Sequence, residues 1–189
     1  MPTPQELNDK ELVILALKNK NDFCYIIERY EKQLTSYIRR LTSVRDEDIE
    51  DILQEVFIKI YQNLNEVDES LKFSSWVYRI THNEVISHYR HHKNRPRVLA
   101  SSDDETVEFL RSVINVEEDV NRNISAKQMQ DLLAELDLKY REILILRYFE
   151  EKNYDELSDI LKKPKGTVAT LLNRAKKQLA EKYFKKYDK

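Results

Sequence analysis

The residues with the clearest chemistry lie in a basic segment between positions 165 and 177, near the end of the chain. Amide and hydroxyl side chains suit the hydrogen-bonding edges of DNA bases, whereas lysines and arginines suit phosphates. Once the apolar residues of this segment face inward with helical spacing, its polar residues face outward. The candidate DNA contacts are Lys165, Thr167, Thr170, Asn173, Arg174 and Lys177.

The sequence around this segment predicts how its outward face is held. Residues 155–161 have the spacing of a short helix whose Leu157, Ile160 and Leu161 face inward. Pro164 and Gly166, the only glycine of the chain, are expected to set a tight turn, and Thr167 to cap or open the next helix. A short helix, a turn and a basic helix form the pattern of a helix-turn-helix, whose second helix can lie in the DNA major groove.

The net charge of −2 hides a strong segregation of charge along the chain. Residues 46–69 contain nine acids and one base, and residues 82–97 contain four Lys or Arg, four His and one acid. Residues 159–189 contain ten Lys or Arg and three acids. This dipolar pattern indicates two different partners, one anionic and one cationic.

Composition favours a helical protein. One glycine and four prolines supply few turns, which disfavours an all-β fold with many short strands. A single cysteine, Cys24, cannot form an internal disulfide, and we expect it to be a packed thiol in a cytoplasmic protein. Neither a signal peptide nor an apolar run of membrane length is present, so we expect no membrane insertion.

Apolar residues recur with helical spacing over 11–18, 23–41, 49–64 and from Phe73 until before Pro96. Asp46 is a natural N-cap for the third of these helices. Trp76 falls on the apolar face of the fourth and is expected in the core. These faces would bury one another in a first helical bundle.

The periodicity weakens after this bundle and then returns. Residues 96–124 are expected to be a flexible acidic linker, with room for a short helix. Ser125 and Asp137 would cap two further helices, which the helix-turn-helix completes as a second bundle. The sequence therefore predicts an all-α protein with two small helical domains, 1–95 and 125–189, joined by a linker at 96–124.

Four sequence blocks occur in a characteristic order: DILQEVFIKIY at 51–61, FSSWVYRITHN at 73–83, LDLKYREILILRYF at 136–149 and GTV followed by NRA from 166. Together they resemble the bacterial sigma-70 family, and the short two-domain layout resembles its extracytoplasmic-function branch. The resemblance implies binding to core RNA polymerase and recruitment of that enzyme to promoter DNA. The first domain would read and melt the −10 element, and the second would read the −35 element.

The resemblance also assigns residues to these contacts. It implies that Asp51, Gln54 and Glu55, with Asp48 nearby, bind the clamp coiled coil of the polymerase β′ subunit, and that the β subunit and an anti-sigma factor are further partners. Asp48, Asp51 and Glu55 have the spacing of one helical side, so they would offer an acidic stripe to a basic partner. The positions that match the −10-reading helix are Tyr78, His82, Asn83, Ser87, His88 and Arg90.

Some positions depart from the family pattern. Ala169 and Leu171 stand where many relatives carry lysine and arginine, and His82 stands where many carry arginine. Lys162 occupies the position of the glycine that usually follows the first helix of the motif. These departures predict a weak or unusual grip on −35 DNA.

Two alternatives remain open on the sequence. A stand-alone helix-turn-helix regulator would need a ligand or dimerisation domain at the N-terminus, which an acidic helix followed by a basic tryptophan helix fits poorly. A metal-dependent enzyme could use His88 and His92, four residues apart, but neighbouring basic residues disfavour a cation and no glycine-rich phosphate loop is present. We therefore expect no catalytic activity, no metal and no cofactor.

Overall fold

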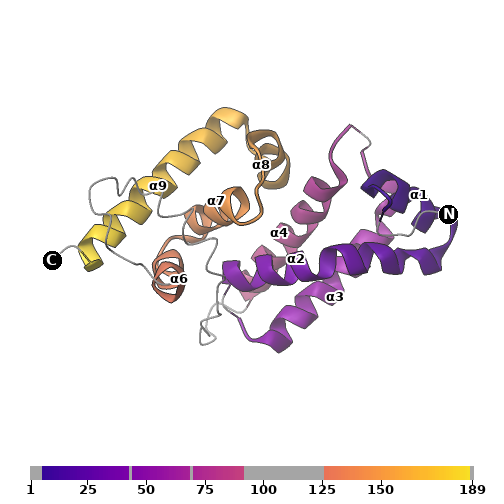
Figure 1. Ribbon diagram of the computed structural model, residues 1–189, viewed down its shortest axis with the longest axis horizontal. Helices are drawn as coiled ribbons and strands as arrows, with labels where there is room; N and C mark the ends of the chain where they lie inside the picture. Colours follow the sequence, from indigo (N-terminus) through magenta and orange to yellow (C-terminus); the bar gives the residue numbers. More distant parts are fainter. Residues whose placement is uncertain (1–5, 43, 69, 92–125, 188–189) are drawn as a thin grey trace. The chain divides into compact units, whose positions relative to one another are not determined.

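The computed structural model describes residues 6–42, 44–68, 70–91 and 126–187, in which all regular structure is helical. Contacts divide the chain into two compact units (Figure 1). One contains helices α1–α4, and the other contains α6, α7, α9 and most of α8. The prediction of an all-α fold with two helical domains is confirmed. The predicted linker and the predicted cap at Ser125 lie outside the described residues.

Three long helices enclose the core of the first unit. Helix α3 packs on both α2 and α4, and α2 also touches α4 (Figure 1). Trp76 is buried, as predicted, and stacks on Phe73 with ring centroids 5.7 Å apart. The elements in chain order are α1 (Asp9–Lys18), η1 (Lys20–Phe23), α2 (Cys24–Thr42), α3 (Asp46–Gln62), η2 (Leu64–Glu66) and α4 (Phe73–His91).

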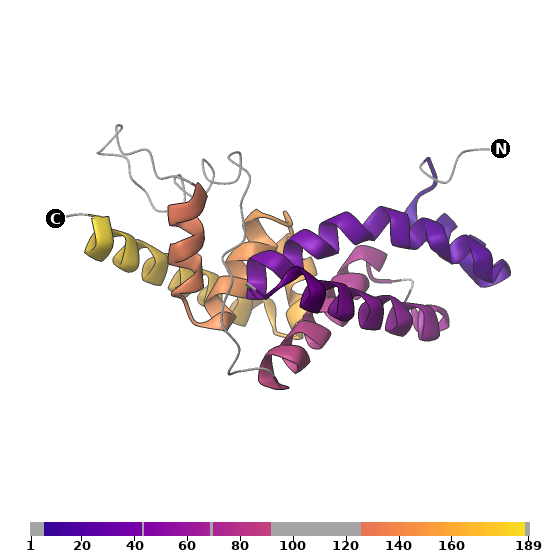
Figure 2. The same cartoon turned by 90° about the horizontal axis from the view of Figure 1, so that it is seen from below.

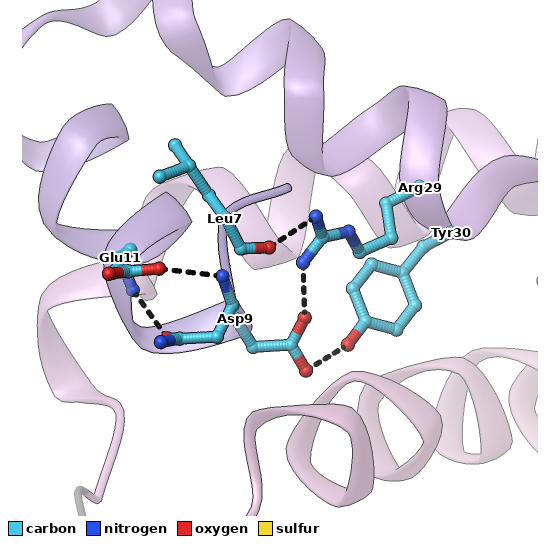
Figure 3. A network of polar contacts seen from close by, with 6 residues as sticks. Leu7, Asp9, Glu11, Arg29 and Tyr30 are labelled. Atoms are coloured by element: carbon cyan, nitrogen blue, oxygen red, sulfur yellow. Dashed lines mark hydrogen bonds and ion pairs between the residues drawn. The ribbon is translucent and has the colours of Figure 1, made fainter. Parts of the chain in front are cut away.

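A polar network anchors the start of α1 to α2 (Figure 3). The Tyr30 hydroxyl donates to one oxygen of Asp9 at 2.7 Å, and the Arg29 guanidinium donates to the other at 3.1 Å. Arg29 also donates to the carbonyl of Leu7 at 2.6 Å. Burial of the ring raises the pKa of Tyr30, and the nearby Asp9 carboxylate raises it further. The network therefore holds Tyr30 as a neutral hydrogen-bond donor.

Two sequence predictions about the first unit are wrong. Asp46 is the first residue of α3 and not its N-cap; Arg45 occupies the cap position without a side-chain bond. The Asp46 carboxylate is bound instead by Arg39 at 2.7 Å. Cys24 is exposed, because it stands at the first position of α2 and the buried positions of that helix begin at Ile26.

The second unit is built around the long helix α9. It packs on α7 and on α6, and Figure 2 shows α6 crossing its C-terminal half. At this crossing Glu135 accepts a bond from Lys186 at 2.7 Å and lies 3.9 Å from Lys182. The bond to Glu135 is the main cause of the raised pKa of Lys186. The helices are α6 (Ala126–Ala134), α7 (Leu138–Tyr148), α8 (Tyr154–Leu161) and α9 (Lys165–Tyr187).

A buried arginine fastens α6 to α7. Arg141 is 2% exposed, and its guanidinium donates to the carbonyls of Leu133, Ala134 and Leu136 at 2.9, 2.6 and 3.1 Å. Carbonyls at a helix C-terminus have no partner within the helix, so a buried helix end needs such donors. Asp137 is the N-cap residue of α7, as predicted, although its side chain makes no capping bond.

Helix α8 is defined by strong signals at both ends. The Asn153 side chain accepts the backbone N–H of Glu156, whose carboxylate accepts the backbone N–H of Asn153 in return. At the other end Lys162 adopts the left-handed conformation, with φ 52° and ψ 46°. The N–H of Lys163 then reaches back to the carbonyl of Ser158 at 3.2 Å, which is the long bond of a Schellman-type cap.

The predicted role of Gly166 in the turn is wrong. Helix α9 already begins at Lys165, and the N–H of Thr167 donates to the carbonyl of Pro164 at 2.8 Å. Gly166 and Thr167 therefore lie inside the first helical turn, and Gly166 does not have a positive φ. Lys162, and not the glycine, takes the left-handed conformation between the two helices.

Candidate functional site

The exposed side of α3 carries a stripe of acidic and amide side chains. Asp51, Gln54 and Glu55 are all exposed, and their three- and four-residue spacing places them along one side of the helix. Glu47 and Glu50 are exposed as well, so the negative charge extends over the first turns. The structure brings together three of the four residues predicted here for binding a protein partner.

Asp48 is the exception in this group. It is 7% exposed, and the Arg45 guanidinium lies 3.3 Å from its carboxylate. A buried carboxylate in an ion pair is not available to a basic partner. The prediction that Asp48 belongs to the exposed acidic stripe is therefore wrong, because the helix turns this residue toward the core.

One ion pair joins α3 and α4 and neutralises the single base of α3 and the single acid of α4. Lys59, the single base of α3, pairs with Glu84 on α4. Glu84 is in turn the only acid between residues 82 and 97. The pair leaves the exposed side of α3 acidic and the following helix without an unpaired acid. The acidic segment that includes α3 and the basic segment that begins in α4 therefore keep opposite net charges, although the two helices pack together.

The predicted DNA-facing residues of α4 have different surroundings. Asn83 and Ser87 are exposed and four residues apart, while His82 and His88 are half-buried beside them. Asn83 and Ser87 therefore share one exposed side of α4, and the two histidines flank it at its edges. Arg90 belongs to the last turn of α4, and its side chain lies outside the described part of the chain.

Tyr78 does not belong to this surface. It is 1% exposed, and its ring packs edge-on against Tyr37 with centroids 5.4 Å apart. A side chain enclosed in this way cannot reach a nucleic acid without unfolding the core, so its prediction as a DNA contact is wrong. The helix turns Tyr78 inward together with Val77 and Thr81, which are both fully buried.

The outer face of α9 brings the six predicted DNA contacts together over its first four turns. All six side chains are exposed. Thr170 donates to the carbonyl of Gly166 at 2.9 Å, Lys165 pairs with Asp155 of α8, and Lys177 lies 4.0 Å from Glu181. Arg174, in contrast, has no ion pair with any residue that the structure describes.

Ala169 and Leu171 contribute little to this face. Both are half-buried, whereas Thr170 between them is exposed. Neither side chain can donate or accept a hydrogen bond. Any hydrogen bonds from α9 to DNA must therefore come from the exposed polar residues around them, above all Asn173 and Arg174.

The sequence did not single out two features of these surfaces. Ile58 is 48% exposed at the end of the acidic stripe, three residues after Glu55, although the other aliphatic side chains of α3 are buried. The same helical spacing that joined the acidic residues would have revealed it. Asp155, in the first turn of α8, pairs with Lys165 on the outer face of α9. This contact could not be predicted without knowing the angle between the two helices.

Comparison with known proteins assigns the chain to a family. Residues 26–95 match the model "Sigma-70 region 2", and residues 126–179 match "Sigma-70, region 4". RNA polymerase sigma factor SigV of Bacillus subtilis (strain 168) is 31% identical over 166 residues, which cover 88% of this chain and 87% of SigV. The chain belongs to the sigma-70 family, in its extracytoplasmic-function branch. The sigma factor also aligns with ECF RNA polymerase sigma factor SigW of the same organism, with 29% identity, 92% of this chain and 96% of SigW.

Family membership settles the general role of the protein. It is a transcription initiation factor that directs RNA polymerase to promoters. The N-terminal half matches sigma region 2, so it is not the ligand or dimerisation domain that a stand-alone regulator would require. That alternative is therefore not favoured.

Solved structures share the fold at low sequence identity. CnrH in complex with the cytosolic domain of CnrY aligns with a TM-score of 0.65 and 20% identity, over 92% of this chain and 95% of that one. RpoE in complex with the anti-sigma factor NepR from Bartonella quintana aligns with a TM-score of 0.61 and 18% identity, over 89% and 99%. Among the described helices of the sigma factor, none is long and apolar enough to cross a membrane.

Proposed function

We propose that the exposed stripe Asp51, Gln54 and Glu55 binds the clamp coiled coil of the polymerase β′ subunit. The observation that carries this proposal is the placement of these three side chains on an exposed side of α3 that has no unpaired base. An acidic stripe speeds encounter with a basic partner and fixes its register. Ile58 is exposed beside the stripe, and burying its side chain at the interface would add a hydrophobic contribution to binding.

The two DNA elements are assigned to the two other surfaces. Residues 1–95 would form the domain that binds the polymerase and reads the −10 element, through His82, Asn83, Ser87, His88 and Arg90. Residues 125–189 would read the −35 element through α9, and residues 96–124 would connect the two domains. Within α9, Asn173 offers an amide to base edges, and Arg174, whose guanidinium has no ion pair among the described residues, suits a phosphate.

Three further properties belong to the same proposal. The sigma factor acts in the cytoplasm, where polymerase and promoter DNA are found. It performs no catalysis of its own, because its surfaces serve to position another enzyme. Two solved relatives of the same fold were captured with CnrY and with the anti-sigma factor NepR, which supports an anti-sigma factor as a further partner, alongside the polymerase β subunit.

A charge reversal tests the polymerase contact. Asp51→Arg with Glu55→Arg places two cations before a basic partner, and like charges across an interface cost several kcal/mol, or about a hundredfold in affinity. The expected result is loss of co-purification with core polymerase at unchanged helicity. Glu28→Arg with Glu31→Arg, two exposed acids of α2, is the matched control. Wild-type co-purification by the Asp51 and Glu55 variant would reject the assignment.

Two variants of α9 test the DNA contact in run-off transcription and in promoter binding by the assembled polymerase. Arg174→Ala should weaken binding to all sequences and reduce the slope against log salt by about 0.9 for the lost phosphate contact. Asn173→Ala should instead reduce discrimination between the promoter and a scrambled −35 element. Lys185→Ala, an exposed cation nearer the C-terminus of the same helix, serves as the control. An Arg174→Ala slope equal to that of wild type would remove Arg174 from the phosphate contacts.

A further inference from the structure

The first side chain of the reading helix is already bound by an acid of its own domain. Lys165 stands at the first position of α9, and its ammonium pairs with the Asp155 carboxylate from the first turn of α8. Both side chains are 66% exposed, so the pair lies at the surface and not in the core. An ammonium held by a carboxylate has the same partner chemistry as an ammonium held by a DNA phosphate.

Helix electrostatics do not explain why a lysine stands at this position. The N-terminus of a helix carries partial positive charge, so a cation there is unfavourable and an anion is favourable. Asp155 obeys this rule at the start of α8, whereas Lys165 violates it at the start of α9. A cation kept at an unfavourable helix end, and compensated from the neighbouring helix, is more consistent with a role in binding an anion than with one in folding.

The other end of the reading face repeats the arrangement more loosely. Lys177 lies 4.0 Å from Glu181, four residues later on the same helix. Between the two paired lysines, Arg174 has no ion pair within the described part of the chain. Among the predicted contacts of α9, Arg174 can therefore bind a phosphate directly. Lys165 and Lys177 must first break an ion pair with a carboxylate of the described domain.

We propose that Asp155 limits the affinity of the reading helix for DNA by competing with phosphate for Lys165. The inference rests on the proposed −35 contact and adds a residue that acts against it. In the free protein the pair reduces attraction to arbitrary DNA sequences, which depends on phosphates alone. On a promoter, Lys165 must give up the Asp155 carboxylate to bind a phosphate, so this contact adds little net affinity. Binding by α9 then depends on its other contacts and on the polymerase.

The magnitude follows from the exposure of the pair. Exposed ion pairs contribute little, and freeing Lys165 should change affinity by about two- to fivefold. A newly available phosphate contact would also steepen the dependence of log affinity on log salt by about 0.9. Asp155→Asn removes the charge but keeps the size of the side chain. The backbone N–H of Asp155, which donates to Asn153, is unchanged.

The test is the salt concentration at which the full-length protein elutes from a resin bearing random-sequence duplex DNA. Asp159→Asn is the matched control, because it removes the same charge one turn later on α8. Asp155→Asn should elute at higher salt than Asp159→Asn. In a Lys165→Met background the two variants should elute together, since the cation that Asp155 restrains is gone.

Two outcomes would overturn the inference: equal elution of Asp155→Asn and Asp159→Asn, or a difference between them that persists without Lys165. Failure of the proposed function looks different, because it appears as Arg174→Ala having no effect on promoter binding by the assembled polymerase. A sigma factor that depends on Arg174 but is unaffected by Asp155→Asn would overturn only the competition between Asp155 and phosphate.

Discussion

The left-handed residue of the helix-turn-helix is Lys162, whereas its glycine, Gly166, has no positive φ. We expect Lys162→Gly together with Gly166→Ala to stabilise the second domain. Lys162 holds a left-handed conformation, which costs a residue with a Cβ about 1–2 kcal/mol. Glycine removes that cost but loses about 0.5–1 kcal/mol through its greater freedom in the unfolded chain. Because the Lys162 side chain is exposed and forms no hydrogen bond or ion pair with the described residues, Lys162→Gly should gain about 0.5–1 kcal/mol net.

The reciprocal change at Gly166 should also stabilise. Gly166 lies in the first turn of α9 without a positive φ, and a Cβ placed there would meet no atom within 4 Å. Alanine is favoured over glycine inside a helix by up to about 1 kcal/mol, and by less in the first turn. The double variant should therefore raise the melting temperature of the second domain by several degrees, at about 4–8 °C per kcal/mol for a domain of this size.

The assay is thermal unfolding of the full-length protein, combined with hydrogen exchange of the peptides that cover α8 and α9. Lys163→Gly is the matched control, since it removes the same charge from the next residue, where φ is not positive. It should destabilise the domain by about 0.4–1 kcal/mol. Equal effects of Lys162→Gly and Lys163→Gly would refute the strain at Lys162, and a loss of stability in Gly166→Ala would refute the open space around Gly166.

Two further predictions concern buried polar groups. Arg141→Met removes the side-chain donor from three carbonyls at and just beyond the end of α6, and it should cost about 3 kcal/mol in urea unfolding. The exposed Lys139→Met on α7, the helix that also carries Arg141, should change stability by less than about 0.5 kcal/mol. Tyr30→Phe removes a hydrogen bond to the Asp9 carboxylate and should cost about 1.5–3 kcal/mol at neutral pH. Because the folded state raises the pKa of Tyr30, this contribution is complete below about pH 10, the ordinary tyrosine value, and is lost as pH rises above it. The stability difference between wild type and Tyr30→Phe should therefore narrow above pH 10, and a constant difference would contradict the stated cause.

The sequence predicted the helices because most of them are amphipathic and begin or end at residues with known preferences. The long apolar faces of α2 and α3 were visible as spacing alone, and Trp76 was placed correctly on the same grounds. Spacing also identified Asp51 and Glu55 as neighbours on one side of a helix. These features depend on the periodicity of a single helix, which the sequence contains in full.

The errors arose where the rotation of a helix about its axis or the conformation of one residue decides the outcome. Asp48 lies one turn from the exposed Asp51, and Tyr78 lies on the same helix as the exposed Asn83 and Ser87, but the orientation of each helix about its axis turns both side chains into the core. Lys162 was noticed as a missing glycine, yet Gly166 was assigned the turn, because composition favours glycine there and cannot show a strained lysine. The pair between Lys165 and Asp155 depends on the packing of two helices and has no local signature.

The separation of charge gives a physical reason why this sigma factor would act through polymerase. A chain of net charge −2 is repelled by DNA at long range, and two of the cations on its reading helix are paired with acids of the same domain. We infer that α9 alone holds DNA weakly. Once the acidic stripe of α3 is bound to the polymerase, the contacts of α4 and α9 become effectively intramolecular, and their free energies add without a further association cost. Weak individual contacts then favour specificity, because a promoter must satisfy both domains before the complex is stable.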